Sequence, residues 1–249
     1  MDKLFQIHCS QIGKISGHVG LTDNQTIKLN ELVERKKLGL KPLTANMELD
    51  LIDLIEKKNN PKLPETCTTY LKEWYANDRE EIRNKYIDKG NMVELDLIDF
   101  MAEQLNLGMA EKNTITMHNE YIVGTADVVT RDTIIDVKAA WSIKTLHDAV
   151  TSGINSDYEW QGRGYMMLWD KPNFVVFHGL LNTPEEANYG VEVSYDDIPA
   201  EHRWVAYKVQ RDVTIEQQII QRVIECREWL ERYDIAVRNS IGKIHIHSI

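Results

Sequence analysis

Two neighbouring runs of β-branched residues, each carrying one aspartate, restrict the possible folds of this chain more than any other feature. Residues 134–138 have the sequence IIDVK, which places Asp136 in a strand that should be buried. Asp127 lies in the preceding run, residues 121–130. Because burying an unpaired carboxylate costs on the order of several kcal/mol, each aspartate needs a donor or a cation nearby. The sequence therefore predicts a sheet built around an acidic site.

The second half of the chain favours further strands connected by helices. Arg131 and Asp132 separate the runs at 121–130 and 133–137, as the turn of a hairpin would. Further strands are predicted over residues 173–181 and 203–210, with helices over residues 143–151, 157–169 and 214–238.

The first 110 residues are predicted to be mainly helical. Thr22 and Gln25 have the spacing of a capping box, which indicates where the first long helix begins. Helices are predicted over residues 22–38, 44–58 and 65–107, the last with an interruption near Gly90. A helical region followed by a small sheet with crossing helices indicates an α/β fold. We expect a single domain over residues 1–249, with a mainly helical part at 1–110 and a sheet core with a C-terminal helix at 111–249.

Composition excludes several classes of function. The 249 residues carry a formal net charge of −10, which argues against coating nucleic acid through bulk charge but permits a local basic groove. Cys9, Cys67 and Cys226 are scattered, so neither a disulfide framework nor a four-cysteine metal site is expected. The apolar stretches are far shorter than the ~20 residues that span a bilayer. The N-terminal residues lack the apolar core of a signal peptide, so we expect a soluble cytoplasmic protein.

Glu94 supplies a third carboxylate at an unusual position. On a helical wheel it lies in the middle of the apolar stripe that contains Leu97 and Ile98, where a charged residue is unexpected. One interpretation is an acid near a helix start, stabilised by the helix dipole. The other is an inward glutamate that joins Asp127 and Asp136 in a set of hard oxygen ligands suited to Mg²⁺ or Mn²⁺.

Two further pairs have the spacing of neighbours on one face. Asp136 and Lys138 are two residues apart on a predicted strand, which would leave Val137 facing the core. Gln161 and Tyr165 are four residues apart on a predicted helix. Each pair also has an ordinary structural interpretation, as an ion pair on a solvated strand and as a tyrosine at the edge of the core.

Taken together and in order, four segments resemble the PD-(D/E)xK nuclease superfamily, specifically its phage recombination exonuclease branch with lambda exonuclease and the YqaJ-like viral recombinases. The segments are KGNMVE at residues 89–94, GTAD at 124–127, IDVK at 135–138 and QGRGY at 161–165. The resemblance implies a restriction-endonuclease-like α/β core, in which a small mixed central sheet is flanked by helices, with an added N-terminal helical region.

The resemblance also implies roles for the residues of the acidic site. Asp127, Asp136 and the main-chain carbonyl of Val137 would hold one Mg²⁺ or Mn²⁺ ion, and Glu94 would complete its shell or help to place a second ion. Lys138 would position or deprotonate the attacking water, the latter with a lowered pKa.

Other residues are expected to bind the substrate. Gln161 and Tyr165 would orient the DNA backbone or the catalytic lysine, and Thr125 would donate its hydroxyl to a phosphate. Ser10 lies in a segment that resembles one in the family where a hydroxyl approaches the DNA phosphate. Trp141 directly follows the acidic strand, where it could stack on a DNA end.

The function implied is a magnesium-dependent exonuclease that degrades linear double-stranded DNA, 5′ to 3′, in phage-type recombination inside a bacterial host cell. The resemblance further implies a homo-oligomeric ring, in the relatives a trimer, and a phage single-strand annealing protein as partner. Two alternatives remain at this point. One is an endonuclease or junction resolvase on the same core, and the other is a non-catalytic DNA-binding or annealing protein.

Overall fold

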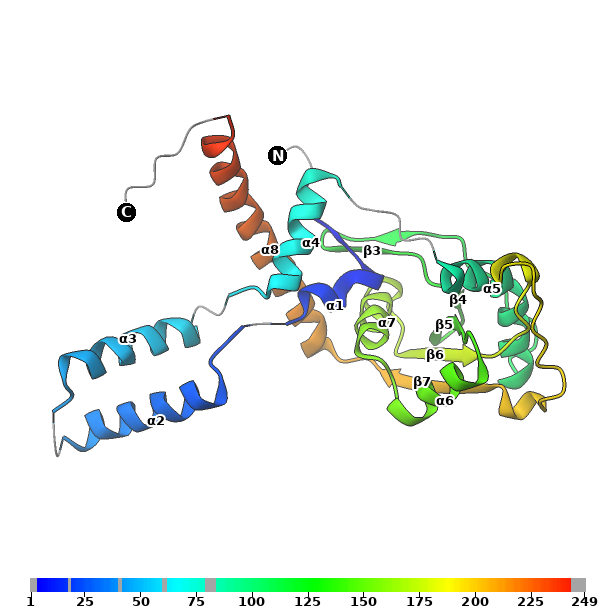
Figure 1. Cartoon of the computed structure of the whole chain (residues 1–249), viewed down its shortest axis with the longest axis horizontal. Coiled ribbons are helices and arrows are strands. Elements are labelled where there is room, and N and C mark those ends of the chain that lie inside the picture. The colour runs from blue at the N-terminus through cyan, green and yellow to red at the C-terminus, as the bar shows by residue number, and fades with distance from the viewer. Residues whose placement is uncertain (1–3, 18, 40–41, 60–61, 79–83, 243–249) are drawn as a thin grey trace.

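The structure is a computed structural model that describes residues 4–17, 19–39, 42–59, 62–78 and 84–242 (Figure 1). Within these residues the strands form two small sheets. A four-stranded sheet has the order β4-β5-β6-β7, and a three-stranded sheet has the order β1-β3-β2. The strands of the larger sheet are β4 (Val128–Val129), β5 (Thr133–Ala139), β6 (Asn173–Gly179) and β7 (Trp204–Gln210). Those of the smaller sheet are β1 (Ile7–His8), β2 (Met117–His118) and β3 (Ile122–Gly124).

The larger sheet is mixed, as the family resemblance implies. β5 pairs with β4 in antiparallel register and with β6 in parallel register, and β6 pairs with β7 in antiparallel register. The main helices are α2 (Asp23–Leu38), α3 (Ala45–Asn59), α4 (Glu65–Ala76), α5 (Lys85–Gln104), α6 (Ile143–Ser152), α7 (Ser156–Trp169) and α8 (Val213–Ser240). Short helical turns are α1 (Ile12–Ile15), η1 (Cys9–Gln11), η2 (Glu185–Ala187) and η3 (Ala200–His202). The α/β fold class, with a small mixed sheet flanked by helices and an N-terminal helical region, is therefore confirmed.

The two faces of the larger sheet pack against different helices. Ile135 and Val137 of β5 face α5, whose buried residues include Leu97, in one apolar cluster. Ile134 lies in a second cluster, together with Met166 of α7. Because side chains alternate along a strand, Asp136 and Lys138 share the α7 side of β5 with Ile134. The strand thus carries its apolar residues into both clusters and its charged residues toward α7.

Close packing of α7 depends on two of its glycines. A Cβ atom at Gly162 would lie 2.1 Å from the ring of Phe174 on β6. At Gly164 it would lie 2.5 Å from Ile12 of α1 and 2.9 Å from Cys9 of η1. A side chain at either position would therefore push α7 away from the sheet or from the N-terminal segment.

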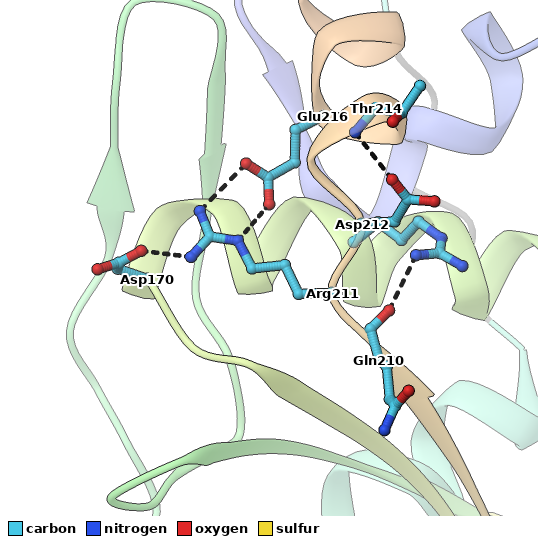
Figure 2. A network of polar contacts seen from close by, with 7 residues as sticks. Asp170, Gln210, Arg211, Asp212, Thr214 and Glu216 are labelled. Atoms are coloured by element: carbon cyan, nitrogen blue, oxygen red, sulfur yellow. Dashed lines mark hydrogen bonds and ion pairs between the residues drawn. The ribbon is translucent and has the colours of Figure 1, made fainter.

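A network of charged residues joins the end of β7, at Gln210, to α7 and α8. Figure 2 shows Arg211, which follows β7, between Asp170 at the end of α7 and Glu216 in the first turn of α8. The side chain of Asp212 caps α8 by accepting a hydrogen bond of 2.8 Å from the amide of Thr214 (Figure 2). These contacts orient α8 relative to the helix that carries Gln161.

The α2–α3 hairpin extends away from the rest of the molecule (Figure 1). The predicted capping box is present, since the Thr22 and Gln25 side chains each accept a hydrogen bond from the other's amide. The two helices share a small apolar cluster of their own, made of Leu29, Leu32, Leu51 and Leu54.

Two local predictions were wrong. α5 runs without interruption through Gly90, because one glycine costs a helix only about 1 kcal/mol relative to alanine. The break comes earlier, where Asn77 ends α4 in a left-handed conformation and Asn84 caps α5. The run at 121–130 is also not one strand, since β3 and β4 belong to different sheets and Asp127 lies between them.

Candidate active site

Asp136, in the buried middle of β5, forms an ion pair with the half-buried Lys138 near the end of the strand. The Lys138 Nζ lies 2.7 Å from Asp136 Oδ2, and the Asp136 side chain is 2% exposed. Gln161 Nε2 of α7 donates a hydrogen bond of 3.0 Å to the other carboxylate oxygen, Oδ1. The two-residue spacing on β5 and the helix packed against it thus place two donor groups, an ammonium and an amide, against one carboxylate.

Asp127 lies beside this carboxylate because the hairpin folds it back. Its Oδ2 accepts a hydrogen bond of 2.8 Å from the main-chain amide of Val137. Burial, together with the negative charge of Asp136, raises the pKa of Asp127 to about 7. Two carboxylates that repel each other in a buried position favour the binding of a cation.

Lys138 is a cation in this arrangement. Burial opposes its charge, but Asp136 in contact and Asp127 nearby outweigh that effect and raise the pKa of Lys138 above its ordinary value. The Nζ also lies 5.1 Å from the ring centroid of Tyr158 on α7. The ammonium of Lys138 is therefore held in place by the Asp136 carboxylate.

Gln161 and Tyr165 connect the acidic pair to the chain before Asp127. Gln161 Nε2 also donates to the Tyr165 hydroxyl at 3.0 Å, and this hydroxyl donates to the main-chain oxygen of Thr125 at 2.9 Å. Burial, with the charge of Asp136, raises the pKa of Tyr165 well above its usual range. The tyrosine is therefore a neutral donor that helps to fix the position of the Gln161 amide.

Glu94, the third carboxylate, is half-buried on α5. Its carboxylate forms an ion pair with Lys112, a residue that the sequence pattern does not single out. Glu94 is close enough for its charge to contribute to the raised pKa of Asp127. Among the described residues, however, no three His, Cys, Asp or Glu side chains lie in an arrangement that could hold a metal ion.

The remaining predicted residues are Thr125, Ser10 and Trp141. The Thr125 hydroxyl hydrogen-bonds to that of Thr116 at 2.8 Å. Ser10 is exposed on η1, next to the buried Cys9 that packs against α7. Trp141 lies three residues beyond Lys138, just past the end of β5.

Sequence reasoning missed a buried lysine beneath Trp141. Lys89 is 1% exposed, and its Nζ donates to the carbonyls of Ala140 and Leu181, each at 2.8 Å. Burial lowers the pKa of Lys89 to about 8. A lysine within a helical stripe of apolar residues was the available signal, but the KGNMVE segment drew attention to Glu94 instead.

No protein-family model and no curated protein sequence matches this chain. Solved structures do. A phage-related exonuclease from Haemophilus somnus 129PT is similar to it with a TM-score of 0.71 and 23% sequence identity, over 94% of this chain and 97% of that one. An alkaline exonuclease from Laribacter hongkongensis has a TM-score of 0.60 and 10% identity, over 97% and 96% of the two chains. Its complex with dAMP has a TM-score of 0.57 and 11% identity, over 95% and 94%. Across nearly its whole length, this chain has the fold of the phage-related and alkaline exonucleases.

Proposed function

We propose that this protein is a divalent-metal-dependent exonuclease that degrades linear double-stranded DNA. The observation that carries the proposal is the buried Asp136, in an ion pair with Lys138 and beside the half-buried Asp127. The shared fold supports it, since two of the solved structures with this fold are exonucleases, one of them also solved with dAMP.

The donor set around Asp136 fits a hard divalent cation. Asp136 Oδ2 is buried, and the Lys138 ammonium lies 2.7 Å from it without a well-aligned hydrogen bond. Asp127, Asp136 and the Val137 carbonyl would hold Mg²⁺ or Mn²⁺, two ions in the complete site. Glu94 would join this set if its carboxylate left the ion pair with Lys112 and bound the metal ion instead. When bound, such ions neutralise charge on the scissile phosphate and activate a water molecule.

The protein's own residues would align the reacting groups. Lys138 holds the attacking water or a phosphate oxygen, because its ammonium is kept charged and oriented by Asp136. Gln161 and Tyr165 prevent the Asp136 carboxylate from turning away. Thr125 and Ser10 donate hydroxyl groups to the DNA backbone on the side of the site nearer α7.

Direction and assembly rest on the family resemblance. We propose 5′ to 3′ degradation by a homo-oligomeric ring, because a chain with a net charge of −10 holds DNA poorly unless several weak contacts act together. The partner would be a phage single-strand annealing protein in the cytoplasm of a bacterial host. The described residues include no helix long and apolar enough to span a membrane. Light scattering tests the assembly, since a mass of 28.9 kDa would mean a monomer.

The decisive experiment compares two DNA substrates with Mg²⁺ and with EDTA. End-labelled linear duplex should be degraded from its ends only with Mg²⁺, and covalently closed plasmid should stay intact. Cutting of the closed plasmid would indicate an endonuclease on the same fold. A DNA mobility shift without cleavage under either condition would indicate a non-catalytic DNA-binding protein.

A further inference from the structure

A second group of residues, distinct from the acidic site, forms an aromatic platform just beyond the end of β5. The platform consists of Tyr86 and Trp141, whose ring centroids lie 5.2 Å apart in an edge-to-face contact. The Lys85 Nζ lies 4.7 Å from the Trp141 ring centroid and 5.4 Å from that of Tyr86. Tyr86 is 57% exposed, whereas a tyrosine that only fills the core would be buried.

Hydrogen bonds hold the main chain of both platform residues in place. The buried Lys89 Nζ donates to the Trp141 carbonyl at 3.3 Å, and the Tyr195 hydroxyl donates to the same oxygen at 3.2 Å. The Asn84 side chain accepts from the amide of Tyr86 at 3.0 Å and so fixes the first turn of α5. The two aromatic rings therefore project from main-chain positions that hydrogen bonds hold in place.

The platform lies within a few nucleotides of the acidic site. Trp141 is three residues beyond Lys138, at most about 10 Å along an extended chain. Tyr86 is two helical turns before Glu94 on α5, about 12 Å along the helix axis. At about 3.4 Å of rise per nucleotide, these lengths correspond to three or four nucleotides of one DNA strand.

We propose that the exposed ring of Tyr86, supported edge-to-face by Trp141, is a stacking site for one nucleobase of the DNA strand held by the acidic site, with the Lys85 ammonium toward that nucleotide's phosphate. The inference rests on the proposed function and adds a substrate-binding site to it. Stacking on an aromatic face accepts every base, which a nuclease without sequence preference requires. It also supplies affinity without positive charge, which suits a chain with a net charge of −10.

Binding of a fluorescent base analogue tests the site without requiring cleavage. Oligonucleotide duplexes with frayed ends carry 2-aminopurine at one of the first six positions, and binding is followed in EDTA. The wild-type protein should quench the fluorescence at one or two adjacent positions, and Tyr86→Leu should abolish that quenching. Tyr86→Phe, which keeps the aromatic face, should restore it. Quenching at no position with the wild type, or equal quenching with Tyr86→Leu, would overturn the proposal.

Degradation of DNA with a missing base tests the same site during turnover. The position of a single abasic nucleotide is varied along the degraded strand. The wild-type KM should rise about tenfold when that nucleotide is at the position that would occupy the platform. Tyr86→Leu should have a raised KM on normal DNA, and its KM should not depend on the position of the abasic nucleotide. The matched control is Tyr233→Leu on α8, which also disrupts an aromatic pair, Trp229 and Tyr233 at 4.8 Å. In this control, KM should depend on the position of the abasic nucleotide as it does in the wild type.

The two arms separate this inference from the proposed function. Position-specific quenching by a protein that degrades no DNA would leave the stacking site standing and refute the nuclease. Degradation with the same abasic profile in wild type and Tyr86→Leu would refute the stacking site and leave the nuclease standing.

Discussion

The main-chain amide of Val137 donates a hydrogen bond of 2.8 Å to the carboxylate of Asp127, ten residues earlier in the chain. The donor lies between Asp136 and Lys138, so this single bond aligns the segment before β4 with the charged face of β5. Because the bond lowers the energy of the ionised Asp127, it partly offsets the burial that favours the protonated form.

Asp136→Asn should abolish cleavage while the fold is retained. The variant keeps an acceptor for Gln161 but removes the charge that orients Lys138 and that would attract the proposed metal ion. We expect the rate to fall by about three orders of magnitude, equivalent to roughly 4 kcal/mol of barrier. Asp132→Asn, an exposed acid in the turn of the same hairpin, is the control and should stay near wild type. Cleavage by Asp136→Asn within tenfold of wild type would rule out this site.

Asp127→Asn should stabilise the metal-free protein at pH 8. The pKa of Asp127 in the folded state, about 7, lies above its unfolded value, so this group's contribution to stability is full at low pH and is lost as the pH rises through 7. Asparagine removes this penalty, which is at most about 4 kcal/mol. Urea denaturation in EDTA at pH 5 and pH 8 measures the effect. A variant equally or less stable than wild type at pH 8 would contradict it.

Lys112→Met should strengthen metal binding, and Glu94→Gln should weaken it. Lys112 forms an ion pair with the Glu94 carboxylate, so its removal would free a carboxylate oxygen for the proposed ion. Isothermal titration with Mn²⁺ should give a Kd several-fold lower for Lys112→Met and several-fold higher for Glu94→Gln. Lys144→Met, at an exposed position on α6, controls for the loss of a positive charge. The same Kd for all four proteins would mean that Glu94 is not a ligand.

Lys89→Met should change how stability depends on pH. The pKa of Lys89 in the folded state, about 8, lies below its unfolded value, so its contribution is present above about pH 10.5 and is lost as the pH falls through 8. The wild type should gain up to about 3 kcal/mol relative to the variant between pH 7 and pH 10.5. Chemical denaturation across this range measures the difference, with Lys144→Met as control. Parallel profiles for wild type and Lys89→Met would show that the buried amine does not titrate there.

Local periodicity was enough to predict the parts of the site that lie within one element. Asp136 and Lys138 meet because they are two residues apart on a strand, and Gln161 and Tyr165 meet because they are four apart on a helix. In both cases the geometry of the element alone determines the contact.

Contacts between distant segments could not be predicted in this way. Lys112 reaches Glu94 from a segment without regular structure, 18 residues away. β1 was missed altogether because it is only two residues long and pairs Ile7 with Ile122. Such short strands form through long-range packing and leave no periodic pattern in the sequence.

The two segments that connect the α2–α3 hairpin to the rest of the chain lie side by side. An antiparallel bridge brings Val19 and Lys62 together there, with the Val19 amide 3.0 Å from the Lys62 carbonyl. The two points where the hairpin leaves and re-enters the main body are therefore already adjacent, as in a domain inserted into a loop. A short turn that replaced the hairpin would leave the positions of the acidic-site residues unchanged. The sequence and length of the hairpin can therefore vary without affecting those residues.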